Sequence, residues 1–277
     1  LPLLADAKVS ADIDLDADLE NMSFTLRENR FVINALKTGI DGTFAVADNG
    51  YDMDVTLTTE TIAFKDLLSL IPTLYSQEFA SMQASGNVRL AAWAKGKLTD
   101  TTVPSFEANI DISEGSIRYP ALPAGIDGIN IDALVNNPGG DPDQTLVKSD
   151  IVVVMAGNLF SSKLTVAKPV FDPGLNVSVR GLIDLGKIKD VFPIDGIKLN
   201  GSLDGDLAFA GRMSQVEAES YDLLRVTGVL KAKDILISPG SIPDIIISGS
   251  EIYFTPQYVT LGQTNMSIGR SDLAGEG

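Results

Sequence analysis

The sequence contains neither cysteine nor histidine. Without cysteine there are no disulfides, thiolate metal ligands or cysteine nucleophiles. Without histidine there is no Ser-His-Asp or Cys-His catalytic group, and the side chain found in most zinc and iron sites is missing. We therefore expect a protein that is not an enzyme, with no catalytic residues, no metal site and no cofactor.

Aromatic and basic residues are also scarce. Aromatic side chains make up 6% of the chain and Trp93 is its single tryptophan, so a surface for stacking sugars is poorly supplied. Lysine and arginine total 21 against 37 acidic residues, which gives a formal net charge of −16. Such a field repels phosphate backbones, and we expect no nucleic-acid partner and no basic patch for anionic lipid head groups. No apolar run reaches the 18 residues or so that a membrane-spanning helix needs.

What the chain does have is apolar residues at every second position. Hydrophobic residues make up 44% of it. The stretch VSADIDLDADL (9–19) alternates apolar and polar or acidic residues, which is typical of a strand with one apolar and one acidic face. The same alternation recurs along the chain in segments 23–36, 43–59, 87–98, 106–119, 163–171, 175–185, 202–211 and 227–238.

Turn signals separate these alternating segments. They include Asn49-Gly50, Glu114-Gly115, the run at 136–143, and segments 172–174 and 238–241. Strands at this spacing predict roughly 15 to 20 strands in total. The short turns favour antiparallel neighbours.

Three segments have helical periodicity instead. Residues 64–75 place apolar side chains on one helical face before and around Pro72, and residues 184–193 end at Pro193. Residues 214–224 begin with Ser214 and Glu217 at the spacing of a capping box. We expect three short helices that cover a sheet edge or an open end.

Two segments of the chain share a similar sequence pattern. Gly86 and Gly96 bound one stretch, and Gly201 and Gly211 bound another with the same spacing. Each stretch follows a short apolar segment that ends in proline, and the strands after it align as well. The repeat predicts an extended sheet built from two similar units. We divide the chain into an N-terminal β-meander (1–59), a first repeat unit (60–182) and a second, truncated unit (183–277).

The acidic clusters have simpler interpretations than catalysis or metal binding. In DIDLDADLE (12–20), neither EF-hand register starting at Asp12 or Asp14 has glycine at its sixth position and an acid at its twelfth. Pairs such as Asp204 and Asp206, or Glu217 and Glu219, have the chemistry of glycosidase carboxylates. Nothing in the sequence distinguishes these pairs from the other acids, and we interpret both groups as solvated faces.

Segment 57–140 resembles the C-terminal, β-rich part of AsmA-like proteins, closest to the Bacteroidetes branch. The resemblance rests on D-L-L-x-L-I-P (66–72), A-S-G-x-V-x-L (84–90), the pattern from Pro104 to Pro123, and N-N-P-G-G (136–140). M-A-G-N (155–158) and G-L-I-D-L-G-K-I-K-D-V-F-P (181–193) extend it to roughly residues 55–215.

The resemblance implies a periplasmic module of a Gram-negative protein that is anchored to the inner membrane by a helix. AsmA-like proteins, with the related TamB group, are linked to outer-membrane assembly and to phospholipid movement between membranes. Like bridge-like lipid carriers, they are thought to have a curled β-groove. The implied partners are phospholipid or another acyl-chain lipid, and outer-membrane assembly proteins. This chain lacks the anchor, which fits a fragment of a longer protein, and membrane contact would then lie in parts outside it.

The expected fold is mainly β, a long curled antiparallel sheet that is either an open β-groove or an elongated sandwich. An open groove would shield acyl chains, whereas a closed sandwich on the cell surface or secreted would serve adhesion or glycan binding. A purely structural spacer is a third alternative. For the lipid-facing strand positions we select Val9, Ile13, Leu15, Leu19, Val88, Leu90, Ile110 and Ile112.

Overall fold

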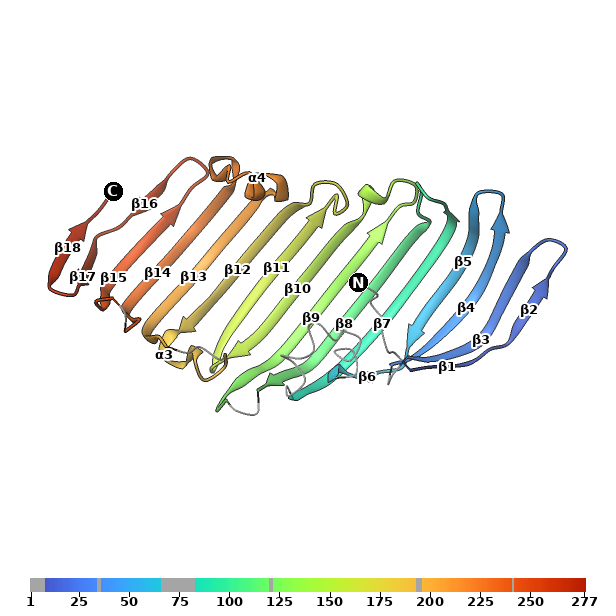
Figure 1. The fold of residues 1–277 in the computed structure, drawn as a ribbon, viewed down its shortest axis with the longest axis horizontal. Helices are drawn as coiled ribbons and strands as arrows, with labels where there is room; N and C mark the ends of the chain where they lie inside the picture. Colours follow the sequence, from blue (N-terminus) through green and yellow to red (C-terminus); the bar gives the residue numbers. More distant parts are fainter. Residues whose placement is uncertain (1–7, 34–35, 66–82, 120–121, 193–195, 241) are drawn as a thin grey trace. The chain divides into compact units, whose positions relative to one another are not determined.

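A computed structural model describes residues 8–33, 36–65, 83–119, 122–192, 196–240 and 242–277. These residues form a mainly β protein whose 18 strands belong to one sheet (Figure 1). Every strand pairing whose register is defined is antiparallel. The prediction of a mainly β fold built on an antiparallel sheet is confirmed.

Most strands overlap the alternating segments of the sequence, but strands also form outside them, within residues 62–63, 125–137, 146–155 and 245–275. Their bounds are β1 Val9–Asp12, β2 Leu15–Asp18, β3 Ser23–Ile33, β4 Leu36–Ala47, β5 Gly50–Thr59, β6 Ile62–Ala63, β7 Gln83–Leu98, β8 Ser105–Arg118, β9 Gly125–Asn137, β10 Leu146–Met155, β11 Asn158–Ala167, β12 Gly174–Asp184, β13 Lys198–Arg212, β14 Arg225–Ser238, β15 Ile245–Phe254, β16 Val259–Leu261, β17 Thr264–Ile268 and β18 Ser271–Gly275.

The chain divides into two compact units. The first unit comprises residues 1–115, 130–149 and 165–173, and the second comprises residues 116–129, 150–164 and 174–277. Strands β1 to β7 therefore belong to the first unit and β12 to β18 to the second, while β8 to β11 contribute to both. The sequence-based division at residues 59 and 182 stays a prediction.

In the first unit, hydrogen-bonded neighbours run β3–β4–β5–β7. Both β1 and β2 pair with β3, and β6 pairs with β7 beside β5. The single strand expected over 9–19 is thus interrupted at Ile13 and Asp14. The interruption lies opposite a bulge in β3, where the register shifts between Leu26 and Asn29.

In the second unit, β12, β13, β14 and β15 pair in sequence order (Figure 1). Strands β16 and β17 both pair with β15, and β18 pairs with β17. Helix α3 lies between β12 and β13, and α4 with η2 lies between β13 and β14, whereas the turn predicted at 238–241 lies between β14 and β15.

Two of the three predicted helices lie among the described residues. Helix α3 (Leu185–Ile188) is capped by Asp184, whose carboxylate accepts a hydrogen bond from the Gly186 amide at 3.0 Å. Helix α4 (Met213–Glu217) is followed by a 3-10 turn, η2 (Tyr221–Leu223). Another 3-10 turn, η1, spans Pro142–Gln144. Of the first predicted helix, Phe64 and Lys65 are helical and residues 66–75 lie outside the described residues.

The capping box predicted at Ser214 and Glu217 is wrong. Helix α4 begins at Met213, two residues earlier than that box requires, so its flanking residue is Arg212. The Arg212 amide donates to the side-chain oxygen of Gln215 at 2.8 Å. Gln215 therefore supplies the back-hydrogen bond that we assigned to Glu217.

The turn predicted at Glu114-Gly115 is also wrong, because β8 continues through these residues. Glu114 adopts a left-handed backbone, with φ of 52°, and Asp234 in β14 does the same with φ of 51°. Next to Asp234, the register of β13 and β14 shifts between Asn200 and Ser202. A left-handed residue can occupy the extra position of a bulge, so a strand can continue through it.

The repeated glycines meet these left-handed residues across the neighbouring strand. Gly86 has φ of 117°, and a Cβ there would lie 3.0 Å from the Glu114 carbonyl oxygen. Gly201 has φ of 96°, and a Cβ there would lie 2.4 Å from the Asp234 carbonyl oxygen. Both repeated stretches thus have a glycine opposite an acidic left-handed residue, and the duplication itself stays a prediction. Gly96 and Gly211 differ, because only Gly96 has a positive φ.

This geometry makes Gly201 intolerant of a side chain. We expect Gly201→Ala to lower the free energy of unfolding by about 2 kcal/mol or more, because of the left-handed backbone and the clash with Asp234. Gly205→Ala is the matched control on the same strand, since its Cβ would meet its nearest atom at 3.6 Å. That change should stay within about 1 kcal/mol of the parent in urea unfolding. Equal effects of the two substitutions would contradict the proposed role of Gly201.

Candidate functional site

The strand register of the first unit gathers apolar side chains on one side of the sheet. Directly opposed residues of antiparallel strands point to the same side. Phe24 opposes Phe44, which opposes Met53, and Ile40 opposes Leu57, which opposes Ala92. We call this side the first apolar face. Its members on β2 to β5 and β7 include Leu15, Ala17, Phe24, Leu26, Phe31, Ile40, Phe44, Val46, Tyr51, Met53, Val55, Leu57, Ala92, Ala94 and Leu98.

Phe24 and Phe44 form the aromatic centre of the first apolar face. Their rings stack with centroids 4.8 Å apart and planes 17° from parallel. Gly42, two pairs along the ladder, lies between Leu26 and Val55 and carries no side chain. A Cβ at Gly42 would lie 2.1 Å from the Asp54 carbonyl oxygen. The backbone at this position leaves no room for a side chain.

The second unit has an apolar face of the same construction. Val177 opposes Phe209 and Val179 opposes Leu207, while Leu230 opposes Ile252. We call this side the second apolar face. Its members include Leu175, Val177, Val179, Ile183, Leu203, Leu207, Phe209, Val226, Leu230, Ala232, Ile235, Ile237, Ile245, Ile247, Ile252, Phe254, Leu261, Met266 and Ile268.

Most of these side chains are only partly covered. Among the described residues, seven hydrophobic side chains are buried: Ile62, Phe64, Val88, Ile112, Ile129, Val191 and Ile235. Met53, Val55 and Leu57 are half-buried, and Val46 on the same face is 44% exposed. The apolar faces therefore present side-chain surface beyond what their neighbours on the strands cover.

The opposite side of each unit carries charged residues. In the first unit, Lys95 and Asp54 form an ion pair at 2.6 Å. In the second unit, Arg180 pairs with Asp206, and Lys231 with Glu251 at 3.1 Å. These pairs are exposed, so each contributes little to stability. The charged side chains place one side of the sheet in contact with water, and the apolar side chains lie on the other side.

Carboxylate hydrogen bonds shift several pKa values on the charged side of the second unit. The Tyr253 hydroxyl donates to the Glu251 carboxylate, and this bond, with the nearby Lys231, lowers the pKa of Glu251. The same bond raises the pKa of Tyr253. The Glu251 carboxylate raises the pKa of Lys231, and the bond to Asp206 raises the pKa of Arg180. All of these groups keep their usual charge at neutral pH.

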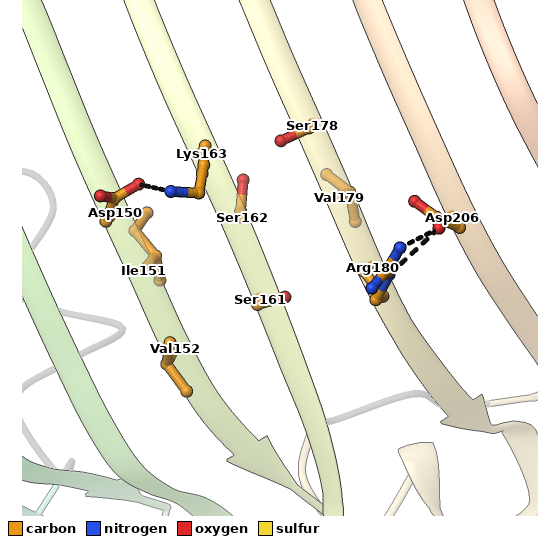
Figure 2. Close-up of a pocket in the computed structure, with 10 residues that line it drawn as sticks. All are labelled: Asp150, Ile151, Val152, Ser161, Ser162, Lys163, Ser178, Val179, Arg180 and Asp206. Carbon is orange, nitrogen blue, oxygen red and sulfur yellow. Dashed lines mark hydrogen bonds and ion pairs between the residues drawn. The ribbon is translucent and has the colours of Figure 1, made fainter.

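A depression of about 360 Å³ lies on the second unit between two ion pairs. Figure 2 shows Asp150 with Lys163 at one end and Arg180 with Asp206 at the other, with Ser161 and Ser178 among the residues between them. Its carboxylates are both engaged by cations, and its serines lie on strands without a nearby base. We assign it no chemistry beyond a hydrated surface.

Four of the predicted lipid-facing residues lie near the N-terminus. Val9 on β1 opposes Ile33 and Leu15 on β2 opposes Leu26, which places both on the first apolar face. Val9 is 61% exposed and Leu15 45% exposed. Ile13 lies between β1 and β2, and Leu19 lies in the turn after β2, where both are exposed.

The other four lie on β7 and β8. Val88 opposes Ile62 and is buried, and Leu90 is half-buried two residues further along the same side of β7. On β8, Ile110 is half-buried and Ile112 is buried. The structure thus brings Val9, Leu15, Val88 and Leu90 onto one face of the first unit. Val88 and Ile112 are already covered by protein.

Sequence reasoning missed the central members of both faces. Phe44, Leu57 and Leu207 lie in segments whose alternation we recognised, but we did not select them. The alternation shows which residues of one strand share a side. It does not give the register between strands, which decides which residues lie next to one another on the face. In the second unit, the bulge at Asp234 also changes which residues of β14 share a side.

The acidic candidates lie on strands and at a helix end. Asp12, Asp16 and Asp18 lie on β1 and β2, and Asp206 is paired with Arg180. The Asp18 carboxylate accepts a hydrogen bond from the Asn21 side chain, which lowers the pKa of Asp18. In the described part of the chain, no three acidic residues are grouped as a metal site would need.

No helix among the described residues is long and apolar enough to cross a membrane. Comparisons of the chain with protein-family models, with curated proteins and with solved structures return no match.

The hydrogen bond between Tyr253 and Glu251 can be tested through the pKa of Glu251. We expect Tyr253→Phe to raise the pKa of Glu251 toward its ordinary value, because the largest cause of its lowering is removed. A carboxyl with a lowered folded pKa contributes stability above its unfolded pKa, and this is lost as pH falls through the folded pKa. The pKa is measured by carboxyl NMR titration, with Tyr51→Phe as control. If the pKa of Glu251 is unchanged in Tyr253→Phe, the hydrogen bond does not lower it and the prediction is wrong.

Proposed function

We propose that this chain is a non-enzymatic lipid-handling module that covers acyl chains with its apolar sheet faces. The observation that carries the proposal is the strand register, which collects aliphatic and aromatic residues on one side of each unit and leaves them partly exposed. Apolar contact is non-directional, and it stabilises by about 0.8 kcal/mol per buried CH₂ group. A lipid tail therefore needs no polar ligand on the sheet.

The dimensions of the second apolar face suit an acyl chain. Each strand residue rises by about 3.3 Å, so the apolar positions from Leu175 to Ile183 extend over roughly 26 Å. The strands from β12 to β18 occupy six positions about 4.8 Å apart, which gives roughly 24 Å across the strands. A lipid tail occupies about half of a 30 Å hydrocarbon core. One face is large enough for a tail along or across the strands.

The chemistry of the faces also separates this proposal from sugar or peptide binding. The central residues Met53, Val55 and Leu57 carry no hydrogen-bonding side-chain groups to match a hydroxyl or an amide. Polar ligands bind through such groups, whereas acyl chains do not use them. Together with the resemblance to AsmA-like proteins, this supports a periplasmic role in lipid transport or outer-membrane assembly, within a longer protein anchored to the inner membrane. Phospholipid is the proposed ligand.

The first test is the lipid that accompanies the protein. Mass spectrometry of solvent extracts from the purified chain should find phospholipid or fatty acid, and Leu57→Asn should reduce the amount because it places an amide in the first apolar face. Thr56→Asn is the control, since Thr56 faces the charged side opposite Trp93. A lipid-free parent protein whose two faces pack against each other would instead favour the sandwich, with adhesion or glycan binding.

The second test locates the lipid, using the absence of cysteine from the chain. Single cysteines replace Leu57 or Thr56 in the first unit and Leu207 or Asp206 in the second, and each carries a benzophenone label. Photolysis with phospholipid should crosslink lipid at Leu57→Cys and Leu207→Cys several-fold more than at their neighbours, because neighbours on a strand point to opposite sides. Equal crosslinking at all four positions would overturn the proposal.

A further inference from the structure

The bulge in β3 contains one residue more than the strands on either side of it. Towards β4, Arg27 and Glu28 lie opposite Asp41 alone. Towards β1 and β2, three residues of β3 lie opposite two, at the break formed by Ile13 and Asp14. Glu28 has a left-handed backbone, with φ of 53°, which costs energy for a residue other than glycine. Glu28 is therefore a single extra residue that is kept out of both ladders.

This extra residue decides which side chains of β3 lie on the first apolar face. Phe31 is separated from Phe24 and from Leu26 by an odd number of residues. In a regular strand, residues separated in this way point to opposite sides of the sheet. Because Glu28 is outside the ladder, Phe31 lies on the first apolar face together with Phe24 and Leu26.

Asp41 holds Glu28 outside the ladder. The Asp41 carboxylate accepts a hydrogen bond from the backbone amide of Glu28. Asp41 opposes Thr56 of β5, on the charged side of the first unit. A backbone donor that leaves its ladder needs another acceptor, and an ionised acceptor forms a stronger hydrogen bond than a neutral one. The carboxylate thus takes the place of a ladder partner for the Glu28 amide.

Asn29 fixes the other side of the bulge. Its side chain is fully buried, and its Nδ2 donates to the Asp14 carbonyl oxygen at 3.0 Å. The Arg27 amide donates to the same oxygen at 3.2 Å. Asn29 opposes Ile40 on the first apolar face, and among the described residues its Oδ1 has no hydrogen-bond partner. A buried oxygen without a partner is unfavourable, so the bond to Asp14 is the contact that compensates for placing an amide here.

We propose that Asp41 and Asn29 are positioning residues that keep both halves of β3 on the first apolar face by holding Glu28 out of the ladder. If Glu28 entered the ladder, the alternation of one half of β3 would be inverted. The consequence for lipid rests on the proposed function, whereas the register of β3 is independent of it.

The half of β3 that would slip is the one before the bulge. At the other end of the strand, Ile33 opposes Leu36, only three residues later, so the chain itself fixes that end to β4. With Glu28 in the ladder opposite Asp41, Leu26 would move from Gly42 to Thr43.

Engineered disulfides report this register, because the chain has no cysteine of its own. Thr25 opposes Thr43, so cysteines at these two positions should form a disulfide in the parent chain. We expect Asp41→Ala to raise disulfide formation between Leu26→Cys and Thr43→Cys about tenfold, because a hydrogen bond to a charged acceptor is lost. Asn29→Leu should act in the same direction, although leucine suits an apolar row better than an amide does.

Matched variants separate positioning from a general loss of stability. Asp41→Asn keeps an acceptor oxygen and should have the register of the parent. Asp54→Ala should also leave the register unchanged, since it removes a carboxylate that pairs with Lys95 on the same side. Deleting Glu28 from Asp41→Ala removes the extra residue itself, and should restore the parent register, or folding if Asp41→Ala alone does not fold. A parent register in Asp41→Ala, or no rescue by the deletion, would overturn the proposal.

Crosslinking to phospholipid connects the register with the apolar face. With the benzophenone label, Leu26→Cys should crosslink lipid several-fold more than Thr25→Cys, and Asp41→Ala should abolish this preference unless Glu28 is deleted as well. If the disulfides report the slip but no position of the parent crosslinks lipid, the proposed function fails and the role of Asp41 stands. If Leu57→Cys crosslinks lipid while Asp41→Ala leaves the register unchanged, the proposed function stands and this inference fails.

Discussion

Antiparallel pairing in register is the constraint on which the rest of this structure depends. Each strand residue points to the side opposite its neighbours, and each pair across a ladder points to the same side. A run such as Ile40, Leu57 and Ala92 exists as a surface only because three strands are aligned to the residue. A slip of one residue in one strand would replace Leu57 by Thr56 or Thr58 on that side. The apolar and charged sides are therefore consequences of pairing, and no single residue creates them.

This dependence explains how much of the fold the sequence predicts. Alternation, turn residues and proline positions predict the strands, their antiparallel arrangement and two short helices, because these depend on near neighbours in the chain. The beginning of α4 was misplaced because Gln215, at the third helical position, competes with Glu217 for the same capping role. The turn at Glu114-Gly115 was misread because a left-handed residue followed by glycine fits a hairpin turn and a bulge equally well.

The candidate site was less predictable for a related reason. Val9 and Leu15 share the first apolar face because β1 and β2 both pair with β3, and the break at Ile13 is matched by a bulge in β3. Val88 obeys the same alternation but is covered, and alternation alone carries no information about what lies over a side chain. The hydrogen bond from the Phe171 amide to the Asp143 carboxylate could not be predicted from sequence patterns, because the two residues are 28 positions apart.

The left-handed residues Glu114 and Asp234 have a consequence for how this chain can change in length. A strand that gains or loses one residue inverts every side chain beyond that point, unless the extra residue is looped out of the ladder. A left-handed residue opposite a glycine is a position where the phase of the strand can be corrected. The two similar stretches are offset by 115 residues at Gly86 and Gly201 but by 120 at Glu114 and Asp234. The difference lies mainly in the connections, residues 99–104 between β7 and β8 and residues 213–224 between β13 and β14. A connection can change in length without changing which side chains of a strand lie on the apolar side and which on the charged side.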